Sequence, residues 1–229
     1  MLGVAVIVVV VGALWALASL PAFCLHALTV TGTSHVERGE VLARAALDPH
    51  ANIWLLDTSA AERRIEGIPY VLAAHVHRRP PGDVWIDVTE RRPTACVRDS
   101  AGHELLVDVA LRVLEEICTP GYGLTYDVRA RLDAGAGAFL DDPELHVLEA
   151  DAAALAAEGD RYRAFSHDAF GQLQATMQSG IEVRFGDDDD LARKQRLIGP
   201  ILAELVPRAL DVRTLDVRAP ATPVVEYRN

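Results

Sequence analysis

Two groups of side chains have the residue types that bind metal ions: four consecutive aspartates, Asp187 to Asp190, and the pair His75 and His77. Clustered carboxylates suit a hard cation such as Ca2+, but carboxylates just before an apolar-periodic stretch also stabilise a helix N-terminus. The histidines are two residues apart, so they share one face of a strand and would suit a transition metal if further ligands converged. No such ligands are identifiable in the sequence. We therefore interpret the aspartates as a helix start and the histidines as a sheet face, and we expect no metal and no other cofactor.

Catalytic motifs are also missing from the sequence. It contains no G-x-S-x-G, S-x-x-K or H-E-x-x-H pattern and no glycine-rich phosphate loop. Ser166 and His167 are adjacent, but neighbours on a strand point to opposite faces, so adjacency does not predict a nucleophile and its base. We therefore expect a non-enzymatic protein without a small-molecule substrate.

The cysteines leave two alternatives open. Cys24 lies in an apolar stretch, whereas Cys96 and Cys118 follow it. A disulfide between the latter two is chemically allowed outside the cytoplasm. An isolated cysteine is more often a small buried hydrophobic residue, and the sequence favours this second interpretation.

Charge is distributed unevenly along the chain. Between Leu28 and Arg98 nine arginines balance nine acidic residues, so the net charge of -11 comes from the part that follows. Nucleic-acid binding needs a basic surface, so nucleic acid is excluded as a partner.

The first half of the chain predicts the element order β-α-α-β-β. Capping-box patterns at Ser34 to Glu37 and at Ser59 to Glu62 indicate where two helices begin. Alternating runs at 71–78 and 83–91 predict two strands, joined by a tight turn at Pro80-Pro81-Gly82. Pro93 has no N–H to donate, so we expect it to end this ladder.

The segment from Ile68 to Ala95 contains I-P-Y-V, R-x-P-P-G and I-x-V-x-E-R-x-P-x-A in order. This pattern resembles the POTRA module of the FtsQ/DivIB family of bacterial cell-division proteins. Val30-x-Gly32 and 52–57 also resemble family positions. The resemblance implies a POTRA domain over 26–96, and we expect the Tyr70 ring to pack in its core.

The second half predicts a mixed domain over 97–229 that is dominated by antiparallel β-strands, so the fold class is α+β. Ile181-x-Val183-Arg184-x-Gly186 with Lys194, and 215–218, resemble stretches of FtsQ-like proteins, although Asp187 stands where those relatives have a basic residue. The periodicity predicts strands at 103–108, 170–177, 181–185, 212–218 and 224–227, and either a strand or a short turn of helix at 111–117. It also predicts helices at 145–157 and from 191 onward, the last interrupted by Pro200.

The first 25 residues carry no charged side chain. A helix of about 20 residues spans the hydrocarbon core of a bilayer, so 1–25 predicts a transmembrane helix. The alternative is a cleaved signal peptide, because Ala16-Leu17-Ala18 resembles a cleavage site. The resemblance implies a single-pass protein of the plasma (inner) membrane with its folded domains outside the cytoplasm.

The resemblance also implies a function. FtsQ/DivIB proteins act at the division septum, where they hold an FtsB/FtsL pair near the septal peptidoglycan synthase and do no chemistry. Pairing would be by β-augmentation, in which an edge strand binds a partner strand through its free backbone groups. The family's edge strand maps onto the end of the chain, and the predicted partner-binding residues are Val224, Val225, Glu226, Tyr227 and Arg228.

Pro220 and Pro223 lie just before these residues and lack donors, so we expect them either to confine pairing to 224–228 or to make it weaker than in relatives. Two other classes stay open. A POTRA-bearing assembly or chaperone factor would need tandem POTRA repeats, and the sequence contains no internal repeat. An exported ligand-binding module would need a deep pocket lined by convergent titratable groups, whereas an open sheet edge would favour the scaffold.

Overall fold

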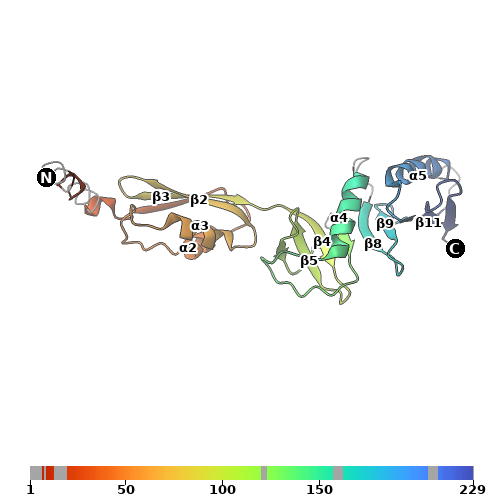
Figure 1. Ribbon diagram of the computed structural model, residues 1–229, viewed down its shortest axis with the longest axis horizontal. Helices are drawn as coiled ribbons and strands as arrows, with labels where there is room; N and C mark the ends of the chain where they lie inside the picture. The colour runs from red at the N-terminus through yellow and green to blue at the C-terminus, as the bar shows by residue number, and fades with distance from the viewer. Residues whose placement is uncertain are drawn as a thin grey trace. The chain divides into compact units, whose positions relative to one another are not determined.

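The computed structural model describes residues 7, 9–12, 20–119, 123–156, 162–205 and 211–228. The chain divides into two compact units, Met1–Arg92 and Pro93–Asn229 (Figure 1). The predicted boundary at 96/97 falls inside β4 (Pro93–Arg98), a strand of the second unit's sheet. Pro93 thus opens a new strand, three residues after the first unit's last strand, β3, ends at Glu90.

The first unit has the predicted β-α-α-β-β order, and its strands form one sheet in the order β1-β3-β2. β3 pairs in parallel with β1 and antiparallel with β2. Helices α2 and α3 lie on one face of this sheet (Figure 1), and Val41, Ile65 and Ile86 are fully buried between the layers. The elements are β1 (Ala27–Thr31), α2 (Arg38–Ala45), α3 (Thr58–Glu66), β2 (Val71–Arg79) and β3 (Asp83–Glu90).

Tyr70 is buried, as predicted, at 9% exposure, and its ring stacks on His35 with the ring centroids 3.9 Å apart. Its carbonyl accepts a hydrogen bond from the Arg91 N–H at 2.7 Å. Tyr70 therefore joins the start of β2 both to the core and to the end of β3.

Both predicted capping boxes are wrong. Helix α2 begins at Arg38, and its N-cap residue Glu37 makes no side-chain capping bond. Helix α3 begins at Thr58, and Asp57 caps it by accepting a hydrogen bond from the Ala60 N–H at 2.9 Å. The pattern misled because Ser34 has a partner that is distant in sequence.

That partner is Glu90, the acidic residue of the E-R-x-P pattern. Its carboxylate accepts hydrogen bonds from the Ser34 hydroxyl and from three successive backbone N–H groups at 2.8 to 3.0 Å, those of Ser34, His35 and Val36. Burial opposes the charged form, but these bonds outweigh it and lower the pKa of Glu90 to about 2. Glu90 therefore fastens the end of β3 to the segment that leads into α2.

The predicted helix over Met1–Leu25 is wrong at its C-terminal end. Pro21–Phe23 form a short 3-10 helix, η1, and Cys24 forms an isolated bridge with Asn52. Within the part of the chain that the structure describes, no helix has the length and apolar character needed to cross a membrane. Residues 1–6, 8 and 13–19 lie outside the described residues, so the membrane anchor stays a prediction.

The second unit is built on one sheet with the strand order β12-β11-β10-β9-β8-β7-β4-β5-β6. The pairs β4–β7, β7–β8 and β10–β11 are parallel and the other neighbours are antiparallel, so the mixed, mainly antiparallel sheet is confirmed for the described strands. The strands after β4 are β5 (Glu104–Asp108), β6 (Val113–Glu115), β7 (Leu124–Asp127), β8 (Tyr162–His167), β9 (Leu173–Met177), β10 (Glu182–Gly186), β11 (Val212–Asp216) and β12 (Val224–Tyr227).

Two helices, α4 (Pro143–Ala156) and α5 (Leu191–Leu205), supply apolar side chains to the core of this unit. Leu148 and Ile198 from the helices and Val97 from β4 are fully buried in the same cluster. The predicted interruption at Pro200 is wrong, because α5 runs through this exposed residue. Strands β7 and β8 were not predicted.

Cys96 and Cys118 form a disulfide, with their Cα atoms 6.1 Å apart, so the buried-thiol interpretation is wrong. β5 pairs with both β4 and β6 and thereby brings the two cysteines together. Sequence could not show this, because the pairing depends on the order of strands in the sheet.

Candidate functional site: the open edge of the second sheet

β12 is the outermost strand of the second sheet, and among the described residues no strand pairs with its outer side. On its inner side it runs antiparallel to β11, with Leu215 opposite Val225 and Asp216 opposite Val224. Val224 is 56% exposed and Tyr227 is 45% exposed. Four of the five predicted partner-binding residues, 224–227, therefore lie on a strand whose outer side is unpaired among the described residues, and Arg228 follows it directly.

The backbone of β12 has a defined orientation. The Arg228 N–H donates to the Asp211 carbonyl at 2.8 Å, so it points toward β11. Backbone groups alternate in direction along a strand, and therefore the N–H groups of Val225 and Tyr227 point toward the open edge. These donors could bind the carbonyl groups of an added strand.

The side chains of β12 divide between the two faces of the sheet. Val225 packs against the core cluster, so it lies on the same face as the helices. Val224 and Glu226 lie on the opposite face by the two-residue period. There the carboxylate of Glu182 accepts a hydrogen bond from Arg184 at 2.8 Å and raises the pKa of Arg184, with further contributions from Glu226 and Asp216.

Arg228 is already engaged within the chain. Its Nη2 donates to the Gly180 carbonyl at 3.1 Å, and its Nη1 lies 3.7 Å from the Asp211 carboxylate. Both groups are within the second unit, so Arg228 fastens the end of β12 to the neighbouring strands. Of the five predicted residues, Arg228 has a side chain engaged in polar contacts within the chain, and Val225 has one that packs against the core.

The predicted prolines do not interrupt β12. Pro220 and Pro223 both lie in the turn between β11 and β12, where the Thr222 N–H donates to the Ala219 carbonyl at 3.0 Å. Arg218 begins this turn and donates to Asp216 from Nη2 at 2.6 Å. Although burial raises the pKa of Asp216, the bonds from Arg218 lower it overall, so the pair is charged at neutral pH.

Gly186 and Lys194, which lie in a stretch that resembles FtsQ-like proteins, help to hold the part of the sheet next to β12. Gly186 has a φ of +76°, and a Cβ there would lie 2.8 Å from the Arg218 side chain, so glycine is required. Lys194 is buried and its Nζ donates to the Asp187 carbonyl at 2.7 Å. The four aspartates precede α5 as predicted, and neither they nor the two histidines belong to a converging set of three or more metal ligands among the described residues.

On two other outer strands, β6 and β2, outward backbone groups have hydrogen-bond partners within the chain. At the far end of the same sheet, the Val113 N–H of β6 donates to Ala138, and the Gly137 N–H donates to Val113, each at 2.8 Å. In the first unit, the outward N–H groups of Ala74 and Val76 on β2 donate to the carboxylates of Glu66 and Glu62 at 3.2 and 2.8 Å.

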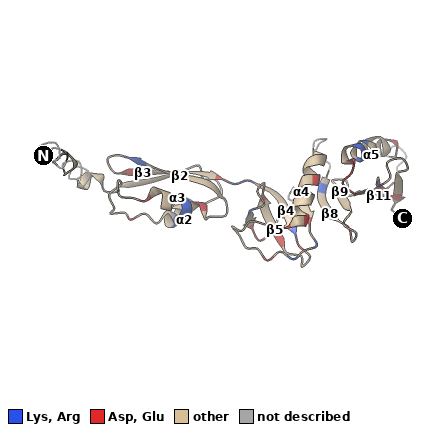
Figure 2. Cartoon of the chain, in the orientation of Figure 1, with Lys and Arg blue, Asp and Glu red and all other residues tan. Residues whose placement is uncertain are grey.

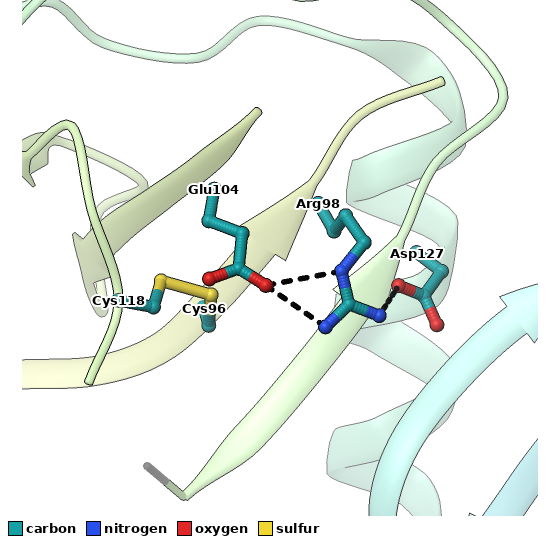
Figure 3. The surroundings of a disulfide bond; sticks show 5 residues. All are labelled: Cys96, Arg98, Glu104, Cys118 and Asp127. Carbon is teal, nitrogen blue, oxygen red and sulfur yellow. Dashed lines mark hydrogen bonds and ion pairs between the residues drawn. A yellow bond between two sulfur atoms is a disulfide. The ribbon is translucent and has the colours of Figure 1, made fainter. Parts of the chain in front are cut away.

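A cavity of about 650 Å³ lies on the face of the second sheet that carries the disulfide. Three of its charged groups are paired with one another, because Arg98 donates to Glu104 at 2.9 Å and to Asp127 at 3.1 Å (Figure 3). Burial raises the pKa of Asp127, an effect that Arg98 opposes. The sulfurs of Cys96 and Cys118 and a Glu104 oxygen lie within 4.8 Å of one another, but disulfide sulfurs are not thiolate ligands.

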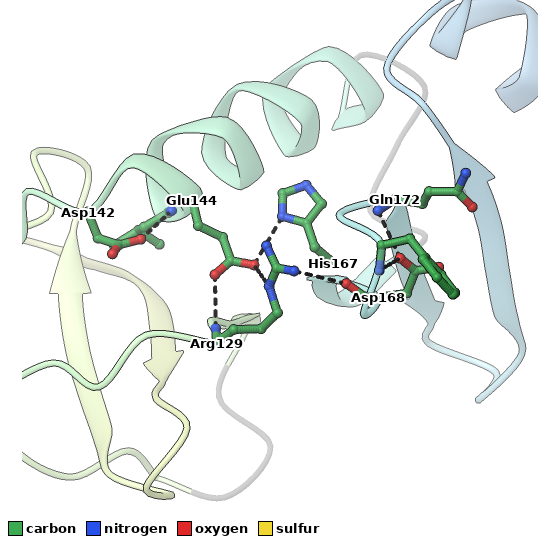
Figure 4. A network of polar contacts seen from close by, with 8 residues as sticks. Arg129, Asp142, Glu144, His167, Asp168 and Gln172 are labelled. Carbon is green, nitrogen blue, oxygen red and sulfur yellow. Dashed lines mark hydrogen bonds and ion pairs between the residues drawn. The ribbon is translucent and has the colours of Figure 1, made fainter.

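A second polar cluster joins α4 to the sheet (Figure 4). Glu144 accepts hydrogen bonds from the Arg129 Nε at 2.7 Å and from the His167 Nδ1 at 3.3 Å. Arg129 also donates to the Asp168 carbonyl at 3.2 Å. His167 is thus bonded to a structural carboxylate, and this cluster explains how α4 is held over β8.

The fold and this edge define a class: a POTRA module followed by a sheet domain with an open terminal strand. The family described as "POTRA domain, FtsQ-type" matches residues 23–91.

Most of the chain is also similar to curated relatives. The cell division protein FtsQ of Myxococcus fulvus is 32% identical over 217 residues, which cover 90% of this chain and 73% of that protein. The FtsQ of Streptomyces griseus is 32% identical over 203 residues, covering 85% and 94% of the two chains. The FtsQ of Syntrophotalea carbinolica is 29% identical over 192 residues, covering 76% and 64%. The chain belongs to the FtsQ family of cell division proteins, so the predicted resemblance is confirmed.

Proposed function

We propose that this protein is a non-enzymatic, single-pass membrane scaffold of the bacterial division machinery. An N-terminal helix would anchor it in the plasma membrane at the division septum, with both folded units outside the cytoplasm. It would bind FtsB/FtsL-like partners and thereby support the septal peptidoglycan synthase. The FtsQ-type match and the relatives named as cell division proteins support the role in division.

The observation that carries the partner-binding proposal is the open edge of β12. An incoming strand would accept hydrogen bonds from the N–H groups of Val225 and Tyr227, and these backbone bonds would supply affinity. Specificity would come from side chains on the two faces, Val225 on the helix face and Val224 with Glu226 on the other. In the disulfide-side cavity Arg98 is already paired with Glu104 and Asp127, which gives no comparable reason to propose a bound small molecule.

The direct test is to compare Val225→Pro with Val225→Ala in the full chain. Proline removes an N–H that points to the open edge without removing a bond to β11, so we expect Val225→Pro to lose most of its capture of the FtsB/FtsL pair from detergent-solubilised cells. Alanine keeps the donor and should retain capture. Deleting 224–229 should abolish capture while the first unit stays folded. Undiminished capture by the truncated chain would place the interaction elsewhere.

A further inference from the structure

Two large apolar side chains are exposed side by side in the connection between α2 and α3. Trp54 is 49% exposed and Leu55 is 81% exposed, although the flanking Ile53 and Leu56 are buried. Such a loop is normally polar at its tip, and a local apolar patch on a soluble surface marks a contact with something else. We call Trp54 and Leu55 the loop tip.

The loop tip is joined to the chain that follows the apolar N-terminal segment. The Leu25 N–H donates to the Ala51 carbonyl and the Ile53 N–H donates to the Phe23 carbonyl, both at 2.9 Å. The Phe23 and Trp54 rings meet edge to face with their centroids 6.1 Å apart. Leu20, at the end of the uncharged segment, is 45% exposed. The loop tip therefore adjoins the point where the apolar segment enters the first unit.

The loop tip is also held rigidly. Arg78 donates from Nε to the Ile53 carbonyl at 2.7 Å and from Nη2 to the Leu56 carbonyl at 2.6 Å, which brackets the two exposed residues. The Asn52 side chain accepts a bond from the Trp54 N–H at 2.9 Å. A preorganised apolar tip loses little conformational freedom when it binds a surface.

The turn between β2 and β3 lies at the same end of the unit. The His26 N–H donates to the Gly82 carbonyl at 2.7 Å, so the turn contacts the chain just after η1. The Arg79 guanidinium lies 3.5 Å from the centre of the Trp85 ring, and basic residues mark this turn in Figure 2. Aromatic rings with basic groups beside them are typical of the interface between a bilayer and water.

We propose that the loop tip inserts into the interfacial layer of a lipid bilayer and forms a second membrane contact of the first unit. This inference rests on the proposed function, because it requires the N-terminal segment to anchor the chain. Asp48 and Asp57 flank the loop, and their carboxylates already bind backbone N–H groups of His50 and Ala60. Trp54 and Leu55 themselves carry no charge, so insertion of the loop tip needs no anionic lipid and should persist at high salt.

The test uses the full chain in phosphatidylcholine nanodiscs that contain brominated lipids, which quench tryptophan fluorescence. With Trp54 as the single tryptophan, after Trp15→Phe and Trp85→Phe, we expect strong quenching by lipids brominated near the headgroup. Adding Leu55→Asp should remove most of that quenching. Adding Leu72→Asp, at an exposed position of β2 that is 51% exposed, should leave it unchanged.

A second reporter separates the two proposals. With Trp15 as the single tryptophan, quenching by deeply brominated lipids reports insertion of the N-terminal segment. Quenched Trp15 with unquenched Trp54 would overturn the loop-tip contact and leave the anchor standing. If neither tryptophan were quenched, both the contact and the membrane anchor would be wrong.

Discussion

The outer strands β2 and β12 differ in whether the backbone N–H groups on their outer edges are covered. On β2 the outward N–H groups of Ala74 and Val76 bind the carboxylates of Glu66 and Glu62, which reach across from α3. On β12 the outward N–H groups of Val225 and Tyr227 face an edge with no neighbouring strand among the described residues. A free edge promotes pairing with another chain, so covering the edge of β2 and leaving the edge of β12 open favours association at β12 over association at β2.

The opposite end of the second sheet supports this interpretation. There the backbone at 137–138 covers β6, so this edge too is closed, by chain rather than by carboxylates. The open edge of β12 is therefore a feature of one strand, not of the sheet as a whole.

The largest expected effect compares two tyrosines at the ends of the contrasting strands. Tyr70→Ala removes a ring that is buried at the start of β2 and should lower the free energy of unfolding of the first unit by about 3 kcal/mol. Tyr227→Ala, on half-exposed β12, should lower that of the second unit by less than about 1 kcal/mol. Urea unfolding of both full-length variants would measure the difference. Equal losses would mean that β12 is as firmly packed as β2.

A smaller effect tests the covering of β2. Replacing Glu62 and Glu66 by alanine leaves two outward N–H groups without charged acceptors and should cost about 1 to 3 kcal/mol. It should also cause concentration-dependent self-association, detectable by analytical ultracentrifugation in detergent. The matched control replaces Glu37 and Glu40, exposed residues at the start of α2, and removes the same charge. A double variant that stayed monomeric would show that the carboxylates do not protect this edge.

The smallest expected effect is on the acid stability of the first unit and involves Glu90, the last residue of β3. Because the pKa of Glu90 is about 2 in the folded state and 4.5 ordinarily, its contribution to stability is present above pH 4.5 and is lost as pH falls toward 2. Glu90→Gln should therefore flatten the stability of the first unit between these pH values, and the variant should unfold more easily than the parent chain at pH 7. Denaturation at a series of pH values would show it. An unchanged acid profile would mean that other groups of the first unit set its sensitivity to acid.

Much of the fold follows from local pattern. Alternation at 71–78 and 83–91 predicted β2 and β3, and helical spacing near 145 and 191 predicted α4 and α5, because each pattern is formed by neighbours in sequence. The terminal strand 224–227 was predicted with its bounds as the structure has them. The predicted start of α2 was wrong, because Ser34 binds a carboxylate 56 residues away, which an i to i+3 pattern cannot detect.

By itself, the sequence determined the POTRA order, the family, and the identity of the strand that ends the chain. The tertiary structure decided that this strand lies at an edge, that the Val225 and Tyr227 N–H groups point outward, and that Cys96 meets Cys118. The reason is physical. Propensity and periodicity act between residues close in the chain, whereas edge exposure and disulfide pairing depend on the order in which distant strands assemble.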